Sequence, residues 1–305
     1  MVICFYTCEV SNFNQSLSLI STSTLQLLRI PFSYFLMPVY WFAISFSTEV
    51  NVIKAILIFF ILHILLYPSS NGYNSYMDRD DTSIGGLEKP MQPTQQLFVV
   101  TIVMDLLAIL FAFLISNLFV TGVIFYIICS RLYSYRGVRL KKYPIAGYIT
   151  VIVNQGAAIF FLVWHGVQPE LPVNVPWQGV VAAAFLIGGF YPITQIYQHE
   201  SDATDKVITI SMLLGKRGTF VFCALMYVVA FSMLYLYFLQ TGQLSLFFIL
   251  NIFFIPVIFY FLRWMLRVWK QPADANFKET MKMNWLASTC TSLAFITIII
   301  LQHRG

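Results

Sequence analysis

The chain has 305 residues and a net charge of +5, with 59% hydrophobic and only 10% charged residues, and its mean hydropathy is +0.76. A soluble domain has about 45–50% apolar and about 25% charged residues, because water must wet its surface. The composition therefore excludes a soluble globular protein and predicts a polytopic integral membrane protein. We expect the lipid bilayer to be its main solvent and expect no nucleic-acid partner.

The first 24 residues are rich in Ser and Thr and lack a basic start followed by a cleavable apolar run. We therefore expect no signal peptide here and a polar N-terminal tail over residues 1–24. The remainder, residues 25–305, is predicted to form a single transmembrane domain.

A helix needs about 20 mostly apolar residues to cross about 30 Å of hydrocarbon. Nine such runs follow one another along the chain: 25–46, 52–69, 97–115, 118–130, 144–167, 180–196, 219–239, 244–263 and 283–302. The third and fourth runs are separated by only two residues, Ser116 and Asn117, which predicts a tight hairpin there. The sequence thus predicts an all-α bundle of nine transmembrane helices.

The basic residues support this number of spans and give an orientation. With nine spans, the N-terminus and the loops after the even-numbered spans lie on one side. Only Lys54 and Arg304 of the 18 basic residues then fall on the other side. Cytoplasmic loops carry an excess of Lys and Arg, so we expect a cytoplasmic N-terminus (in a cell membrane, if the host is bacterial).

Two acidic segments follow the second and sixth spans, and their polar residues have the same spacing. The first segment has Asn71, Asn74, Asp78 and Asp81, and the second has Gln195, Gln198, Asp202 and Asp205. Positions i, i+3, i+7 and i+10 fall on one face of a helix. We therefore expect each even span to extend past the apolar core, and the two polar stripes to face each other across the bundle.

Two stripes of carboxylates in one pocket repel each other unless cations lie between them. Oxygen ligands without His or Cys favour Mg²⁺, which leaves coordination positions for phosphate oxygens. The pattern therefore predicts a magnesium site for a phosphate ester. The alternative is that these are ordinary acids on solvated cytoplasmic loops, which does not explain the repeated spacing.

The loop after the fourth span supplies positive charge. It contains Arg131, Tyr133, Tyr135, Arg136, Arg139, Lys141 and Lys142. These side chains are suited to clamping a diphosphate from the side opposite the metals. The positive-inside rule alone would also place basic residues here, and the spacing does not decide between the two readings.

Three segments resemble the motifs of the UbiA family of intramembrane prenyltransferases. Asn74 to Asp81 (N-S-Y-M-D-R-D-D) is similar to the first Asp-rich motif, N-D-x-x-D-x-x-x-D. Tyr133-Ser134 followed by Arg139-Leu-Lys141 resembles the family's basic-tyrosine loop. Gln198 to Asp202 (Q-H-E-S-D), with a downstream Leu-Gly, is similar to the second motif, D-x-x-x-D. The length and the order of the motifs agree as well.

The resemblance implies a helical bundle around a central, lipid-open cavity with an Asp-rich active site at its cytoplasmic end. It implies that Mg²⁺ binds an isoprenyl diphosphate, whose prenyl group passes to an aromatic or other lipophilic acceptor, as in the biosynthesis of quinones or lipids. Ionisation of the C–O bond would give an allylic cation, which apolar walls protect from water.

Carried over residue by residue, the resemblance assigns the following roles. The metal ligands are Asn74, Asp78 and Asp81 on one side and Asp202, Asp205 and Glu200 on the other; Asp78, Asp202 and Tyr133 are the catalytic residues; Arg139 and Lys141 bind the diphosphate. Asn154 is a further candidate for substrate binding, from its polar character inside a span and not from the resemblance. Tyr133 is expected to orient Arg139 and Lys141. Ser75, Thr82 and Gln198 stand where the family has acids, and fewer anionic ligands should weaken metal binding.

Two polar residues inside the spans need partners or a function, because polar groups in lipid are costly. Asn154 in the fifth span either lines the cavity or forms a hydrogen bond between helices. For Asp105, in the third span, we expect a structural partner.

Other functions remain open at the level of sequence. A terpene cyclase of the same fold would capture the cation within its own substrate, and a non-catalytic relative would bind a lipid diphosphate or nothing. A transporter or channel would need ionisable residues at the bilayer midplane. Almost every acid instead lies at one interface, which argues against transport.

Overall fold

The computed structural model describes residues 20–302, so residues 1–19 of the predicted tail and Arg304 lie outside the described residues. Within residues 20–302, nine helices are long and apolar enough to cross a membrane, which confirms the predicted all-α class and number of spans. They are Thr22–Ser45, Val52–Asp78, Gln95–Ala112, Asn117–Ser134, Pro144–Val167, Trp177–Gln195, Ile210–Gln240, Leu244–Lys270 and Phe277–Gln302. The first helix begins at Thr22, so the end of the predicted polar tail is already helical.

Three spans are divided. The first consists of α2 (Thr22–Leu27), η1 (Ile30–Leu36) and α3 (Met37–Ser45). The second consists of α4 (Val52–Phe60), the π-helical turn η2 (Ile61–Leu66) and α5 (Tyr67–Asp78). The fifth consists of α8 (Pro144–Val151), the π-helical turn η4 (Ile152–Ala158) and α9 (Ile159–Val167). The remaining elements are α6 (Gln95–Ala112), α7 (Asn117–Ser134), η3 (Leu140–Lys142), α10 (Trp177–Gln195), α11 (His199–Thr204), α12 (Ile210–Gln240), α13 (Leu244–Lys270), η5 (Pro272–Asp274) and α14 (Phe277–Gln302).

The predicted hairpin between the third and fourth spans is present. The helix α6 ends at Ala112, and α7 begins at Asn117. Ser116 is the N-cap of α7, because its hydroxyl accepts a hydrogen bond from the Phe119 amide at 3.0 Å. Ser at this position satisfies a backbone donor that the helix itself leaves unpaired.

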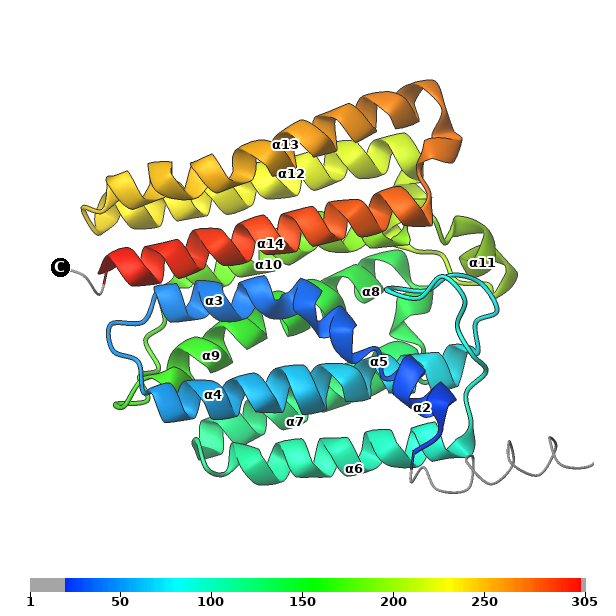
Figure 1. Ribbon diagram of the computed structural model, residues 1–305, viewed down its shortest axis with the longest axis horizontal. Coiled ribbons are helices and arrows are strands. Elements are labelled where there is room, and N and C mark those ends of the chain that lie inside the picture. Colours follow the sequence, from blue (N-terminus) through cyan, green and yellow to red (C-terminus); the bar gives the residue numbers. More distant parts are fainter. Residues whose placement is uncertain (1–19, 303–305) are drawn as a thin grey trace, which may run out of the picture.

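The helices run side by side (Figure 1). The last helix, α14, packs against the first span through α3, so the contacts between spans close into a ring. The helix α10 contacts both α12 and the turn η4, which places the sixth span between the fifth and the seventh. Large apolar side chains such as Ile53, Leu114 and Phe259, which are 79%, 66% and 66% exposed, cover the outer face. Such a surface requires lipid, and the chain is a multi-pass membrane protein.

The acidic segments lie at the same end of the bundle. In Figure 1 the end of α5, the loop that follows it and the short helix α11 gather at one end of the spans. The second helix continues to Asp78, well past the apolar run that ends at residue 69. The sequence therefore correctly predicts that this span extends into a polar segment.

Candidate active site

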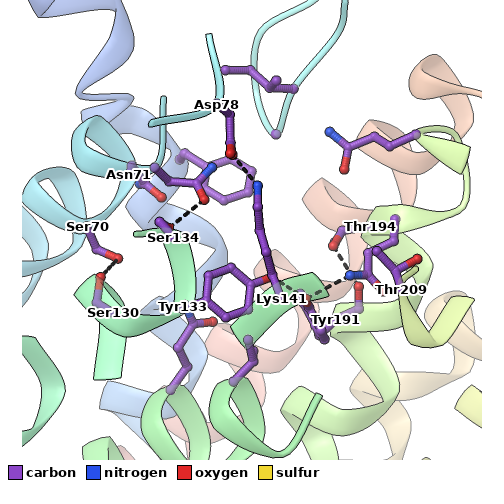
Figure 2. A pocket seen from close by; sticks show the side chains of 18 of the residues that line it. Ser70, Asn71, Asp78, Ser130, Tyr133, Ser134, Lys141, Tyr191, Thr194 and Thr209 are labelled. Atoms are coloured by element: carbon purple, nitrogen blue, oxygen red, sulfur yellow. Dashed lines mark hydrogen bonds and ion pairs between the residues drawn. The ribbon is translucent and has the colours of Figure 1, made fainter. Parts of the chain in front are cut away.

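A cavity of about 200 Å³ opens between the spans at the end that carries both acidic segments. Three carboxylates line it, those of Asp78, Asp80 and Asp202, together with the cations Arg29 and Lys141. The two polar stripes therefore contribute to one site, as expected from their matching spacing. Figure 2 shows Lys141 reaching across the cavity to Asp78.

The end of α5 decides which acids face the cavity. Asp78 is the last residue of the helix, and Arg79 adopts the left-handed conformation (φ 55°) that ends it. Asp80 consequently lines the cavity, whereas Asp81 is exposed and accepts a hydrogen bond from Gln92 at 2.5 Å. The expectation that Asp81 continues the helical stripe is wrong, because the helix ends before it.

The second acidic segment is also broken. The helix α10 ends at Gln195, and α11 starts a new direction at His199. Asp202 lines the cavity from α11, but Glu200 is exposed and does not line it. The predicted continuous helix from Gln195 to Asp205 is therefore wrong, because the chain turns between α10 and α11.

The loop between α7 and α8 connects the two acidic segments. Arg139 is buried and forms ion pairs with Asp205 and, at 3.4 Å, with Asp78. Lys141 forms an ion pair with Asp78, and Arg136 donates to the carbonyl of Met77 at 2.6 Å. The predicted basic loop therefore lies against the acids, as expected.

These ion pairs shift the titration of the groups involved. Burial alone would lower the pKa of Arg139, but its hydrogen bond with Asp205 and the nearby carboxylates outweigh this and raise it. Burial would likewise raise the pKa of Asp205, and the bond from Arg139 instead lowers it. The pair is therefore fully charged across the physiological range of pH.

Two of the acids that line the cavity, Asp80 and Asp202, have raised pKa values. Burial raises the pKa of Asp202 to about 7, against the opposing charge of Lys141 and with the support of Asp80 and Asp78. Burial, followed by the charge of Asp78, raises the pKa of Asp80 to about 6. Carboxylates with pKa values this high lie where too little positive charge stabilises their ionised form. A bound cation would supply that charge and lower their pKa values.

The donor set fits magnesium. Within the described residues, no three Asp, Glu, His or Cys side chains are already arranged as a metal site. Mg²⁺ in phosphate sites, however, needs only one or two carboxylates, and the substrate and water supply the other oxygens. The three carboxylates that line the cavity, Asp78, Asp80 and Asp202, meet this requirement in number and kind. The amide of predicted ligand Asn74 accepts a hydrogen bond from Ser134 at 2.8 Å.

Two of the three neutral replacements, Thr82 and Gln198, join the two loops directly. The hydroxyl of Thr82 bonds to Ser201 at 3.0 Å. The side chain of Gln198 donates to the carbonyl of Ser83 at 3.3 Å. The third, Ser75, is buried, and its hydroxyl has no hydrogen-bond partner among the described residues.

Tyr133 lines the cavity, and among residues 20–302 no hydrogen bond joins its hydroxyl to Arg139 or Lys141, which it was expected to orient. Its hydroxyl lies 2.5 Å from that of Tyr191, which also accepts a hydrogen bond from Gln195 at 2.7 Å. This network joins α7 to α10, so Tyr133 positions the wall of the cavity and not Arg139 or Lys141.

Arg29 is a cavity residue that the sequence interpretation missed. It is 8% exposed and adopts the left-handed conformation (φ 47°) between α2 and η1. Its guanidinium donates to the carbonyls of Asn71 at 3.1 Å and Gly85 at 3.3 Å. Gly85 has to be a glycine, because a Cβ there would lie 2.7 Å from the Phe32 ring. The feature of the sequence that could have identified Arg29 is its position as a single Arg near the start of an apolar span.

The polar residues inside the spans have two different roles. Asp105 forms an ion pair with Arg131 and accepts a hydrogen bond from Ser69 at 2.6 Å, which confirms the expected structural partner. Arg131 therefore supports this buried pair, stacked at 4.0 Å on the Tyr73 ring, and does not line the cavity. Asn154 fits both expectations, because it lines the cavity and donates to the Tyr126 carbonyl at 3.3 Å.

A smaller apolar groove adjoins the cavity. The groove has a volume of about 50 Å³ and lies between α3, α10, α12, α13 and α14. Phe35, Ile187 and Phe190 line both the groove and the cavity. The charged cavity and the apolar groove are therefore neighbours that share one wall.

Comparison with solved structures identifies the fold. A UbiA homologue from Archaeoglobus fulgidus bound to DMAPP and Mg²⁺ has a TM-score of 0.67 and 17% identity, covering 91% of this chain and 99% of its own. The apo UbiA homologue from Aeropyrum pernix K1 has a TM-score of 0.68 and 17% identity, covering 90% and 98%. A digeranylgeranylglyceryl phosphate synthase has a TM-score of 0.60 and 18% identity, covering 91% and 98%.

None of the curated proteins compared with the chain matches it. The sequence profile of the UbiA prenyltransferase family, however, matches residues 35–286, which is most of the chain. The match includes both acidic segments and the basic loop between α7 and α8. The chain belongs to the UbiA prenyltransferase family.

Proposed function

We propose that the protein transfers an isoprenyl group from a prenyl diphosphate to a lipophilic acceptor inside the membrane, and that the reaction depends on Mg²⁺. One observation carries the proposal. Carboxylates from both acidic segments meet the cations Arg29 and Lys141 in one cavity, and an apolar groove shares part of its wall. This arrangement suits a molecule with a diphosphate head and a hydrocarbon tail.

The ligands of the related structures support the class of donor. UbiA homologues from Archaeoglobus fulgidus are bound to DMAPP with Mg²⁺ and to GPP with Mg²⁺. Both ligands are prenyl diphosphates. We extend this class of donor to the present chain because its cavity has both charge types that a metal-bound diphosphate requires.

The basic side chains bind the diphosphate. Lys141 and Arg139 are paired with Asp78 and Asp205 in the structure, so they are held at the mouth of the cavity before substrate arrives. When a diphosphate enters, they donate hydrogen bonds to its oxygens, and Arg29 approaches from the first span. Asp78, Asp80 and Asp202 would hold Mg²⁺, which when bound would supply positive charge to the leaving diphosphate.

The walls protect the allylic cation. Phe35 and Phe190 separate the reacting carbon from lipid, and Tyr191 is held in place by its bonds to Tyr133 and Gln195. Aromatic faces attract a cation, and an apolar wall excludes the water that would otherwise trap it.

The neutral replacements change the strength of metal binding. Thr82 and Gln198 bond across the loops and contribute no charge. We therefore propose that this protein needs a higher Mg²⁺ concentration than a relative with all of the acids. The mouth of the cavity faces the cytoplasm in this proposal, because that end carries almost all of the basic residues.

The test uses purified protein in lipid nanodiscs, with geranyl, farnesyl and geranylgeranyl diphosphates supplied singly. Release of diphosphate and the organic products are followed with and without Mg²⁺ and a panel of acceptors. The proposal predicts release that requires Mg²⁺ and yields a prenylated acceptor, and loss of it in Asp78→Ala/Asp202→Ala. A cyclic product formed without acceptor would establish a cyclase instead, and no release under any condition would refute the proposal.

A further inference from the structure

The inner part of the cavity is polar but carries no acidic or basic side chain among its described lining residues. The hydroxyls of Ser70 on α5 and Ser130 on α7 lie 2.6 Å apart (Figure 2). The phenol of Tyr126 faces the side chains of Ser70 and Gln155. Asn154 completes this group, which we call the neutral cradle (Ser70, Tyr126, Ser130, Asn154 and Gln155).

The neutral cradle lies well below the acids. Ser70 precedes Asp78 on α5, and at 1.5 Å per residue their Cα atoms are about 12 Å apart along the helix axis. The bond between Asn74 and Ser134 lies between these two levels. On α7, Ser130 precedes Ser134 by four residues, about 6 Å, which matches the step from Ser70 to Asn74 on α5. Both helices therefore carry the cradle about 6 Å below the Asn74–Ser134 bond, and the acids lie above that bond.

Asn154 has an unused hydrogen-bond acceptor in the cradle. The side chain is 4% exposed, and its amide nitrogen donates to the Tyr126 carbonyl at 3.3 Å. Its Oδ1 atom has no hydrogen-bond partner in the described part of the chain. A buried carbonyl left unpaired is costly, so a donor from a ligand or a water molecule is needed.

The backbone holds Asn154 at this place. It lies in the π-helical turn η4, and turns of this kind are frequent at functional sites. Gly156 lets η4 approach α10 closely, because a Cβ there would lie 2.7 Å from the Ala183 carbonyl oxygen. The widened turn and the close contact fix Asn154 against the cavity.

The cations that line the cavity serve the donor. In the proposed function Lys141 and Arg29 bind the diphosphate, and the neutral cradle itself contains no basic side chain. A carboxylate or phosphate in the cradle would therefore lack a counter-charge in a low-dielectric site. A hydrocarbon tail would leave the Asn154 carbonyl unpaired.

We infer that the neutral cradle binds the acceptor, and that the acceptor is an uncharged molecule that presents a hydroxyl hydrogen to Asn154. This inference rests on the proposed prenyl transfer and names its acceptor class. The bond between the allylic carbon and the diphosphate oxygen breaks, and its electron pair leaves with the diphosphate. A carbon or oxygen of the acceptor forms the new bond to the allylic carbon. The cradle contains no base, so the proton that the acceptor loses passes to the released diphosphate.

The experiment compares two acceptors that differ only in charge, an aromatic hydroxy acid and its methyl ester, in nanodiscs with geranylgeranyl diphosphate and Mg²⁺. We expect kcat/KM to be at least about tenfold higher for the ester. Asn154→Leu should raise the KM for the ester about tenfold, the loss expected for one hydrogen bond to a neutral group. The KM for the diphosphate should not change. Asn251→Leu on α13 is the matched control, because within residues 20–302 the bond of this Asn is to the Phe247 carbonyl of its own helix.

The failure of this inference is distinguishable from failure of the proposed function. If the protein uses the free acid as well as or better than the ester, or if Asn154→Leu leaves the KM for the ester unchanged, the inference about the acceptor is wrong. Neither result would contradict the proposed prenyl transfer. If no donor reacts, binding of the ester is measured directly by the rise in Tm. The ester should then stabilise the native protein but not Asn154→Leu, and equal stabilisation would refute the inference. If Asn154→Leu does not fold, Ser130→Ala is the replacement, with the same expected change in KM.

Discussion

Asp80 and Asp81 are adjacent acids with opposite expected roles. The structure places Asp80 in the cavity and Asp81 on the exposed surface, because α5 ends at Asp78. Asp80→Asn removes one negative charge from the proposed metal site and keeps the shape of the side chain. Asp81→Asn makes the same chemical change one residue further on, so it is the matched control.

The expected size of the effect follows from electrostatics. A carboxylate and a doubly charged cation about 4 Å apart interact with about 8 kcal/mol at an effective dielectric constant of about 20. If water or phosphate replaces the lost ligand and recovers about three quarters, Asp80→Asn costs about 2 kcal/mol, or about 30-fold in Mg²⁺ affinity. Asp81→Asn loses only a surface hydrogen bond to Gln92, so we expect a change of less than about twofold.

The assay measures the rate of diphosphate release as a function of Mg²⁺ concentration, for both variants in the same nanodiscs. The reasoning predicts that the Mg²⁺ concentration giving half-maximal rate rises in Asp80→Asn alone. An equal rise in Asp81→Asn would contradict it. That result would mean that the loop after α5 rearranges and that the second acid reaches the metal.

Three further predictions test other parts of the structure. The pKa of Asp202 is raised to about 7 and that of Asp80 to about 6, mainly by burial, so the metal-free protein binds more protons than the unfolded chain at pH values between about 4 and 7. Its Tm without Mg²⁺ should therefore fall as the pH rises through this range. The affinity for Mg²⁺, measured by calorimetry, should rise over the same range. A Tm and an affinity that do not change with pH would argue against raised pKa values at Asp80 and Asp202. Arg29→Ala should raise the KM for the prenyl diphosphate about tenfold or more with little change for the acceptor, and an unchanged KM would remove Arg29 from the site. Asp105→Ala should leave Arg131 buried without its partner and cost about 3–5 kcal/mol, measured as a lower Tm; normal stability would show that the pair contributes little.

Hydropathy and charge predicted the architecture because lipid imposes it. A run of apolar residues long enough to cross the hydrocarbon has few alternatives to a helix. The basic residues then reported the number of spans, and the repeated polar spacing predicted that both acidic segments contribute to one site. Each of these signals depends only on local composition or on spacing along one helix.

The details of the site depended on backbone geometry that no spacing reveals. The left-handed residue Arg79 ends α5 and exchanges the roles of Asp80 and Asp81. The turn after Gln195 likewise separates the second stripe into two helices. Helix ends are set by a few dihedral angles and by contacts between loops, and a pattern of period 3.6 continues past them.

The sequence also did not predict the roles of residues whose partners lie far away along the chain. Arg29 approaches the site from the first span, and Arg131 leaves the basic loop to pair with Asp105 on α6. Both are basic residues near a membrane interface, where the positive-inside rule already accounts for them. Only tertiary contacts distinguish a binding residue from a structural pair.

The most direct test of the account measures diphosphate release from a prenyl diphosphate by the native protein and by Asp78→Ala/Asp202→Ala, across a range of Mg²⁺ concentrations. The account predicts release that saturates with Mg²⁺ in the native protein and is lost in the double variant, even though both proteins remain folded. Equal release from the two proteins, or release that does not depend on Mg²⁺, would show that the cavity at the acidic end is not the site of reaction.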